Sequence, residues 1–303
     1  MRRRSYTLTL AIVSTLALGA CLFPSLDGLV GGDASVVDVS ASSEASPPDA
    51  ITIADADAGS ETDADLDADA DVMRTYAQEI SADLPASWWR FGETDAHAPA
   101  YDEMGAAPGV YQIPGVTVGV TRAIANDKNS AAKFDGNNGA MYVSGSLYDF
   151  GGTSSFCIEV WVSPAHAVDA SDAIQRIVSH RTTTPYVGWR LYLDGSLRAY
   201  FDRWNNDVAV ATVSTSKALT TNKFTHLVVT SDGTTLTLYE NGVVESQAPA
   251  GSTGNASTTS LAWATGSLLN GEFFVGALDE ATIYAHPLTP ARVLAHYNAG
   301  LGK

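Results

Sequence analysis

Between residues 87 and 284 the chain is a succession of short β-type runs separated by turn signals. Runs rich in Val, Ile, Thr, Tyr, Phe and Trp are typical of strands when Gly, Asn, Asp or Ser residues bound them. Three boundaries are the dipeptides DG at 194–195, DG at 232–233 and NG at 241–242, where glycine tolerates the positive φ of a tight hairpin turn. Because the runs follow one another in pairs without a strand–helix alternation, they predict an all-β fold, a two-sheet antiparallel jelly-roll sandwich.

The expected strands are short segments with alternating or continuous apolar patterns. They are residues 87–91, 131–135, 140–144, 156–163, 173–181, 188–194, 196–202, 207–213, 224–231, 234–240, 243–247, 273–276 and 278–284. One short C-terminal helix is expected over 289–300, because Thr289 is a good N-cap and Pro290 suits the first helical position. The last strand carries Asp279 and Glu280 side by side. Either this pair is solvated or one carboxylate points inward at a positive group.

The first twenty residues have the features of a secretion signal, with arginines at 2–4, an apolar run and small residues before Cys21. The apolar run is shorter than the about 20 residues that a spanning helix needs. The tetrapeptide LGAC at 18–21 resembles a bacterial lipobox, which implies lipidation of Cys21 and anchoring at a membrane surface. Leu22 follows the cysteine where Asp would favour the inner membrane, so we expect the outer membrane or the cell surface of a bacterium. The alternative is an ordinary signal peptide with a chance cysteine.

Residues 21–79 are expected to be a disordered tether. The stretch 33–79 contains 13 acidic residues and one basic residue, Arg74. It cannot bury enough apolar surface to offset the entropy of ordering, and its like charges repel one another. We therefore expect one folded domain over residues 80–303.

Charge limits the partners of this domain. The whole chain has a formal net charge of −17, whereas residues 80–303 contain 20 acidic and 13 basic residues, a net of −7. No cluster of Lys and Arg occurs in this region of the sequence, so we expect no nucleic-acid partner.

Several segments carry a specific resemblance. FCIEVWVSP, KFTHLVVTSDGTTLTLYENGVVESQ and FFVGALDEATIYAHPLTPARVLAHYNAG follow one another between residues 156 and 300, after SWWRFGETDAHAPAYDEMG and SAAKFDGNNGAMYVS. In this order they resemble successive blocks of the LamG-like jelly-roll family, which has the concanavalin A-like lectin/glucanase fold. The resemblance covers about residues 85–301. The chain departs from the family pattern at Phe224, where Trp is usual, and at Met104, where Ser is usual.

The resemblance implies one structural calcium ion, since many members join the first and last parts of the domain in this way. Carried over to this sequence, its ligands are Asp102, the carbonyl of Gly136, and Asp279. Such a set suits calcium, which takes 6 to 8 oxygen ligands. In the alternative, Asp102 caps a turn and Asp279 pairs with an arginine or with backbone amides.

The fold also hosts glucan-cleaving enzymes, so hydrolysis has to be weighed. A retaining glycosidase needs two carboxyl groups about 5 to 5.5 Å apart, and the glucanases of this fold supply them from one strand with E-x-D-x-E or E-x-D-x-x-E spacing. The sequence contains no such segment. We therefore expect no enzymatic activity, with a glycan-active hydrolase as the alternative.

The segment YFDRWNND at 200–207 is the candidate ligand-binding site. Sugar sites combine an aromatic ring for the C–H face with amides or carboxylates for the hydroxyl groups. The expected ligand-binding residues are Arg181, Tyr186, Trp204, Asn205, Asn206 and Asp207. The alternative is a turn with one exposed tryptophan.

These interpretations lead to one functional expectation. The chain is expected to be a surface-anchored, non-enzymatic recognition module that binds a carbohydrate or an envelope or extracellular protein. A purely structural surface module is a further alternative, because the fold alone does not determine function.

Overall fold

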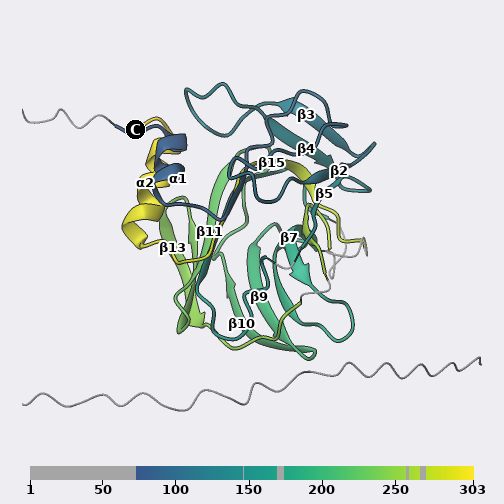
Figure 1. Ribbon diagram of the computed structural model, residues 1–303, viewed down its shortest axis with the longest axis vertical. Coiled ribbons are helices and arrows are strands. Elements are labelled where there is room, and N and C mark those ends of the chain that lie inside the picture. The colour runs from purple at the N-terminus through teal and green to yellow at the C-terminus, as the bar shows by residue number, and fades with distance from the viewer. Residues whose placement is uncertain (1–72, 146, 169–173, 257–258, 267–270) are drawn as a thin grey trace, which may run out of the picture. The chain divides into compact units, whose positions relative to one another are not determined.

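The computed structural model describes residues 73–303, except 146, 169–173, 257–258 and 267–270 (Figure 1). Within the described residues the chain forms two antiparallel sheets and two helices, α1 (Tyr76–Ala82) and α2 (Pro290–Gly300). The predicted two-sheet antiparallel sandwich with a C-terminal helix is therefore confirmed. The predicted signal peptide, the lipidation residue Cys21 and the tether as far as residue 72 lie outside the described residues.

The first sheet has eight strands. They are β1 (Ser87–Trp89), β3 (Val116–Val120), β4 (Ala131–Asp135), β6 (Phe156–Pro164), β11 (Thr225–Ser231), β12 (Thr235–Glu240), β13 (Val243–Pro249) and β15 (Val275–Tyr284). Their order is β13–β12–β11–β6–β15–β4–β3, and β1 pairs with β15 off this path. The last strand thus pairs with the first, with Trp89 opposite Ala281.

The second sheet has seven strands. They are β2 (Val110–Gln112), β5 (Ala140–Val143), β7 (Gln175–Arg181), β8 (Gly188–Leu193), β9 (Ala199–Asn205), β10 (Val208–Ser214) and β14 (Leu261–Trp263). Their order is β10–β9–β8–β7–β14–β5–β2. The strands β2, β3 and β14 are not among the predicted strands, because they are short and lie between turn-rich segments.

The main core lies between the sheets, since alternate residues of each strand face the opposing sheet. Trp89, Trp189 and Trp263 are fully buried in this core. Trp161 is buried on the other side of the eight-stranded sheet, in a second apolar cluster with Tyr76 of α1.

Helix α1 is not predicted from the sequence, and the expected domain start at residue 80 is too late. Thr75 accepts the N–H of Gln78 at 3.3 Å while the Gln78 side chain accepts the N–H of Thr75 at 2.8 Å, which is a capping box. Tyr76 and Ile80, one helical turn apart, are both buried. Figure 1 shows α1 beside α2, and Arg292 of α2 donates to the Asp83 carboxylate at 2.8 Å. Among the described residues, neither helix is long and apolar enough to cross a membrane.

Candidate functional site

The outward face of the seven-stranded sheet carries arginine and aromatic side chains in close alternation. Trp189 and Leu191 of β8 and Phe201 of β9 point into the core. Their neighbours therefore point outward, because side chains alternate along a strand. With flanking residues from the adjoining turns, they form a set that we call the arginine–aromatic array: Arg181, Tyr186, Arg190, Tyr192, Arg198, Tyr200 and Trp204.

Guanidinium groups and rings are stacked within the array. The guanidinium carbon of Arg181 lies 4.1 Å from the ring centre of Tyr186 and 5.1 Å from that of Trp204. The guanidinium carbon of Arg190 lies 5.7 Å from Trp204 and 4.3 Å from Tyr192. All four distances fall within the about 6 Å range of cation–π attraction. The indole of Trp204 is therefore within cation–π range of two guanidinium groups.

The array continues through a pair of tyrosines. Tyr192 and Tyr200 are directly opposite on β8 and β9, and their rings are stacked with centres 5.5 Å apart. Arg198 extends over the ring of Tyr200 at 5.1 Å, and its Nε donates to the Asp194 carboxylate at 3.1 Å. The array thus crosses from the β7–β8 connection to the turn before β9.

Two carboxylates lie beside the array. Asp202 is opposite Arg190 and accepts its Nε and Nη2 at 2.9 to 3.1 Å. Glu272 forms an ion pair with the buried Arg176. Burial acts to lower the pKa of Arg190, but the charge of Asp202 outweighs it and raises that pKa. In contrast, burial and then the charges of Arg190 and Arg176 lower the pKa of Arg181 to about 10.

The structure brings together four of the six expected ligand-binding residues: Arg181, Tyr186, Trp204 and Asp207. The Asp207 carboxylate accepts the backbone N–H of Tyr186 at 2.7 Å. Asn205 ends β9 and Asn206 lies in the turn to β10, so neither stacks in the array.

The sequence interpretation missed Arg190, Tyr192 and Arg198. Tyr200 and Asp202 lie in the predicted segment 200–207 but are not among the expected ligand-binding residues. A usable signal was present, because GWRLYL and AYFDRW alternate apolar residues with Arg, Tyr or Asp. Such alternation predicts that the polar residues share one face. The sequence did not show that β8 and β9 are adjacent in the register that stacks the rings.

Asp102, an expected calcium ligand, is a fully engaged turn carboxylate. Its Oδ1 accepts the N–H groups of Trp88 at 2.8 Å and Met104 at 3.1 Å. Its Oδ2 accepts the N–H of Ala107 at 2.9 Å. These bonds match the alternative interpretation, in which Asp102 caps a turn.

The other two expected calcium ligands lie apart. Asp279 accepts the N–H of Ala123 at 2.7 Å, whereas Gly136 follows β4, whose Ala132 pairs with Leu278. At about 3.3 Å per residue, Gly136 is roughly 13 Å along the strand from Ala132. Calcium–oxygen distances are about 2.3–2.6 Å, so these oxygens cannot share one ion. The ligand set that the resemblance implies does not fit this structure, and among the described residues no group of three His, Cys, Asp or Glu side chains is placed to hold a metal.

The pair Asp279 and Glu280 is buried at a β-bulge. The pairing of β15 with β6 shifts register between Asp279 and Thr282, and Glu280 has a φ of 52°. The bulge places both carboxyl groups on the side away from the main core, with Ala281 facing inward. Burial raises the pKa of Glu280 to about 7. Burial and then the charge of Glu280 raise the pKa of Asp279 well above its usual range.

The sequence left open whether Asp279 and Glu280 are solvated or whether one of them points inward at a positive group. Glu280 points at Arg90. Its carboxylate accepts Nε of Arg90 at 3.0 Å, Nη2 of Arg90 at 2.7 Å and Nε1 of Trp88 at 2.6 Å. In a regular strand Glu280 would point away from Asp279, but the bulge adds one residue between Asp279 and Thr282. Both side chains are buried on the same side of the sheet.

A second buried carboxylate, Glu159, organises the helices. Its Oε1 lies 2.8 Å from the Tyr76 hydroxyl and 2.8 Å from Nε2 of His226. Its Oε2 lies 2.9 Å from Nδ1 of His296, whose Nε2 is 2.9 Å from the Asp83 carboxylate. Both ring nitrogens of His296 face carboxylate oxygens, an arrangement that favours the imidazolium form, in which both nitrogens donate. This network connects α1, α2 and the outer side of the eight-stranded sheet.

The network shifts the pKa values of its members. Burial acts to raise the pKa of Glu159, but the charge of His296 and hydrogen bonds from both histidines lower it below its usual range. Burial acts to lower the pKa of His296, but the charge of Glu159 raises it. Each group therefore favours the charged form of the other, which is the behaviour of a structural ion pair.

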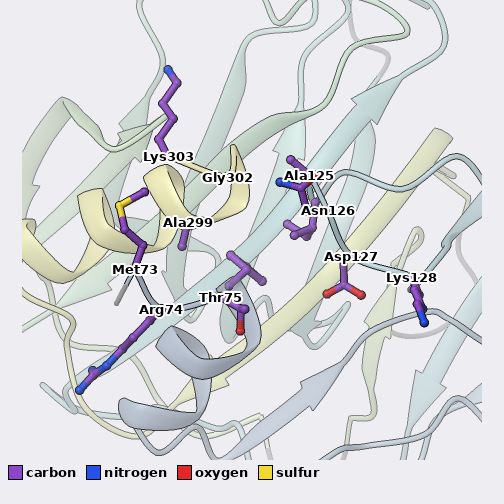
Figure 2. Close-up of a pocket in the computed structure, with 12 residues that line it drawn as sticks. Met73, Arg74, Thr75, Ala125, Asn126, Asp127, Lys128, Ala299, Gly302 and Lys303 are labelled. Carbon is purple, nitrogen blue, oxygen red and sulfur yellow. The ribbon is translucent and has the colours of Figure 1, made fainter. Parts of the chain in front are cut away.

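A cavity of about 450 Å³ lies where α1 begins and α2 ends. Figure 2 shows Arg74 and Lys303 extending in different directions from its wall, with Asp127 on the opposite side. Asp127 accepts Nη2 of Arg90 at 2.6 Å. Arg74 and Lys303 are exposed, whereas the guanidinium groups of Arg181 and Arg190 lie over aromatic rings, so the array is the stronger candidate site.

The fold and the polar face define a jelly-roll domain with a sheet surface suited to binding. The sequence profile described as "Concanavalin A-like lectin/glucanases superfamily" matches residues 125–294. The chain belongs to this family. The resemblance stated from the sequence blocks is thereby confirmed.

Solved structures show the same fold at low sequence identity. The binding domain of botulinum neurotoxin serotype G has a TM-score of 0.54 and 12% identity, covering 70% of this chain and 50% of that one. The binding domain of paraclostridial mosquitocidal protein 1 has a TM-score of 0.54 and 17% identity, and the alignment covers 73% of this chain and 53% of that one. The receptor binding domain of the botulinum neurotoxin C/D mosaic serotype has a TM-score of 0.51 and 11% identity, and the alignment covers 71% of this chain and 51% of that one. The alignments thus span about half of each of these structures, and no curated protein matches the chain.

Proposed function

We propose that this chain is a non-enzymatic recognition module that binds carbohydrate through the outward face of the seven-stranded sheet. The observation that supports this proposal is the arginine–aromatic array, which places rings and hydrogen-bond donors on one surface. Aromatic rings pack against the C–H faces of sugars, and convergent polar groups select the hydroxyl pattern. Membership of a lectin/glucanase family is consistent with this proposal but does not define the ligand.

Hydrolysis is the alternative with less support. The two carboxylates beside the array, Asp202 and Glu272, are each ion-paired with an arginine. A glycosidase needs two carboxyl groups that can reach the scissile glycosidic bond, whereas each of these carboxylates already binds a guanidinium group. This arrangement suits binding better than acid catalysis.

A glycan array with a hydrolysis assay on every bound glycan tests the proposal. We expect binding without product release, and at least a tenfold loss of affinity for Trp204→Ala, about 1.4 kcal/mol. Tyr101→Ala is the matched control, because Tyr101 is an exposed aromatic residue outside the array. Unchanged glycan affinity in Trp204→Ala would show that this face is not the binding site. Release of hydrolysis products would favour the alternative, a glycan-active hydrolase.

We also propose that lipidated Cys21 and the acidic segment after it present the domain at the bacterial surface. The support is the LGAC sequence and the acidic composition of 33–79. Cys21→Ser should release the protein into the soluble fraction, as membrane fractionation with fatty-acid labelling would detect. Equal membrane retention in this variant would argue against the anchor.

Calcium binding stays a prediction of the family resemblance. Calorimetric titration after chelation checks it, together with the melting temperature with and without calcium. If heat of binding appears, unchanged binding in Asp102→Asn would assign it to a site other than the ligand set that the resemblance implies. If calcium gives no heat of binding and leaves the melting temperature unchanged, the prediction of a calcium site is wrong.

A further inference from the structure

A groove lined by cations lies beside the helices, where the described part of the chain begins. It consists of three adjoining hollows, because the cavity of about 450 Å³ beside α1 shares Lys128 with one neighbouring hollow and Arg74 with another (Figure 2). The cationic side chains that line it are all exposed. We call these hollows the basic groove, and its cations are Arg74, Arg122, Lys128 and Lys303.

Two carboxylates also line the basic groove, and both are bound by arginines. Asp127 accepts Nη2 of Arg90 at 2.6 Å. Glu79 forms an ion pair with Arg292 and lies 3.9 Å from Arg74. With four cations against two carboxylates, the groove is locally positive, although residues 80–303 carry a net charge of −7. Within the described part of the chain, three cations of the groove form no ion pair: Arg122, Lys128 and Lys303.

The chain itself brings negative charge to this groove. Met73, the first described residue, lines it, and Asp67, Asp69 and Asp71 occupy alternate positions just before Met73. A chain spans at most about 3.6 Å per residue, so six residues keep all three carboxylates within about 22 Å of Met73. So short a connection gives these carboxylates a high effective concentration at the groove.

The overall charge favours this occupant over an anion from outside. The whole chain has a formal net charge of −17, so its long-range field repels external anions. Exposed ion pairs are individually weak and are screened by salt. A contact of this kind therefore depends on several charges acting together and on the ionic strength.

We propose that the basic groove binds the acidic segment 66–72 of the same chain through Asp67, Asp69 and Asp71. At low ionic strength the contact holds the end of the acidic stretch against the helix pair, and added salt releases it. This inference concerns how the domain is joined to the acidic stretch. It does not depend on the proposed carbohydrate site, which involves other residues.

Carbodiimide cross-linking of the full chain tests the proposal, because the reagent joins a carboxylate to a lysine amine only where the two groups meet. Peptide mass spectrometry measures the yield of links between residues 66–72 and Lys128, in 20 mM and in 1 M sodium chloride. Mixing unlabelled and ¹⁵N-labelled chains identifies links between molecules. Salt is informative because the Debye length falls to about 3 Å at 1 M.

Two variants make the same change in net charge. Arg122→Gln removes a cation of the groove that cannot itself form the link, and Lys217→Gln removes an exposed cation that does not line the groove. Thermal unfolding checks that both variants fold. The comparison of the two salt concentrations uses wild-type protein, so it tests the proposal even if a variant does not fold.

We expect the link to form within one chain at low salt and its yield to fall at least fivefold in 1 M sodium chloride. Arg122→Gln should lower the yield at low salt about threefold, because attraction within the groove is shared among its charges, and Lys217→Gln should leave it unchanged. A yield that responds neither to salt nor to Arg122→Gln would show that covalent proximity alone makes the link, and would overturn the proposal. An equal loss in Lys217→Gln, or links only between differently labelled chains, would overturn it as well. None of these outcomes affects the proposed glycan binding.

Discussion

At the scale of single residues, Glu280 shows how one backbone irregularity brings a charge into the domain. An ordinary strand would place Asp279 and Glu280 on opposite sides. The bulge places both on the outer side of the sheet, where Arg90 binds Glu280 through two nitrogens. The ion pair is buried at Glu280 and partly exposed at Arg90, whose side chain is 19% exposed.

Arg90→Met should destabilise the domain by roughly 3 kcal/mol at pH 8, because it leaves a buried carboxylate without its cation. The loss should be smaller at pH 5, since Glu280 then takes a proton at little cost. Adding Glu280→Gln should restore part of the stability at pH 8. Urea unfolding of the single and double variants measures these differences.

Arg122→Met is the control for this series, because Arg122 is exposed and its loss should change stability by only about 0.5 kcal/mol. An equal loss at pH 5 and pH 8 in Arg90→Met would contradict the charge-based account and indicate lost packing instead.

At the scale of elements, α1 and α2 form a pair held by buried and partly buried charges. Asp83 follows α1 and contacts Arg292 and His296 of α2. His296 in turn contacts Glu159 of β6. The helices cover Trp161 on the outer side of the sheet, so their docking depends on a charged His296.

The stability of wild-type protein should therefore fall as the pH rises through the folded pKa of His296. A histidine whose pKa is raised in the folded protein stabilises the fold fully at a pH below its unfolded pKa of about 6.5. This stabilisation is lost as the pH rises above the folded pKa. The lowered pKa of Glu159 acts in the opposite sense, so its contribution is lost only as the pH falls below about 4.5 toward the folded value.

His296→Gln should lower the free energy of unfolding by roughly 3 kcal/mol at pH 6. It should also reduce the fall of this free energy with pH above pH 6.5. Urea unfolding between pH 6 and pH 9 measures both effects, with the exposed His97→Gln as control. A slope in His296→Gln as steep as in wild type would assign the pH dependence to other groups.

At the scale of the whole molecule, the two ends of the domain complete one sheet. The last strand, β15, lies between β6 and β4 and pairs with β1. The family profile covers residues 125–294, and this range leaves out α1, β1, β2, β3 and the end of α2. The main core includes Trp89, Phe91 and Tyr111 from the omitted part.

A fragment of residues 125–294 should therefore not unfold cooperatively, whereas residues 73–303 should show one cooperative transition. The physical reason is the loss of large buried side chains and of strand partners on both sheets. Circular dichroism during urea unfolding compares the two fragments. A cooperative transition of the short fragment at the same midpoint would show that the terminal elements are dispensable.

Much of the fold could be predicted because its signals are local. The alternation in 188–193, the apolar run within 225–231 and glycine-containing turns such as 241–242 depend on neighbouring residues alone. The sequence interpretation missed the short strand β14 and helix α1, because β14 has three residues and α1 has seven, and the capping box of Thr75 and Gln78 is the main local signal of α1. Tyr76, for example, belongs to the folded domain only because Trp161 and Glu159 contact it.

For the candidate site, the sequence by itself determined which residue types were available. These include Trp204 with its polar neighbours, and Tyr192 and Tyr200, which alternate with apolar residues along β8 and β9. Only the tertiary structure decided that Arg181, Trp204 and Arg190 stack and that Asp102, Gly136 and Asp279 do not meet. The register between strands and a one-residue bulge set these distances, and both follow from contacts between segments far apart in the chain.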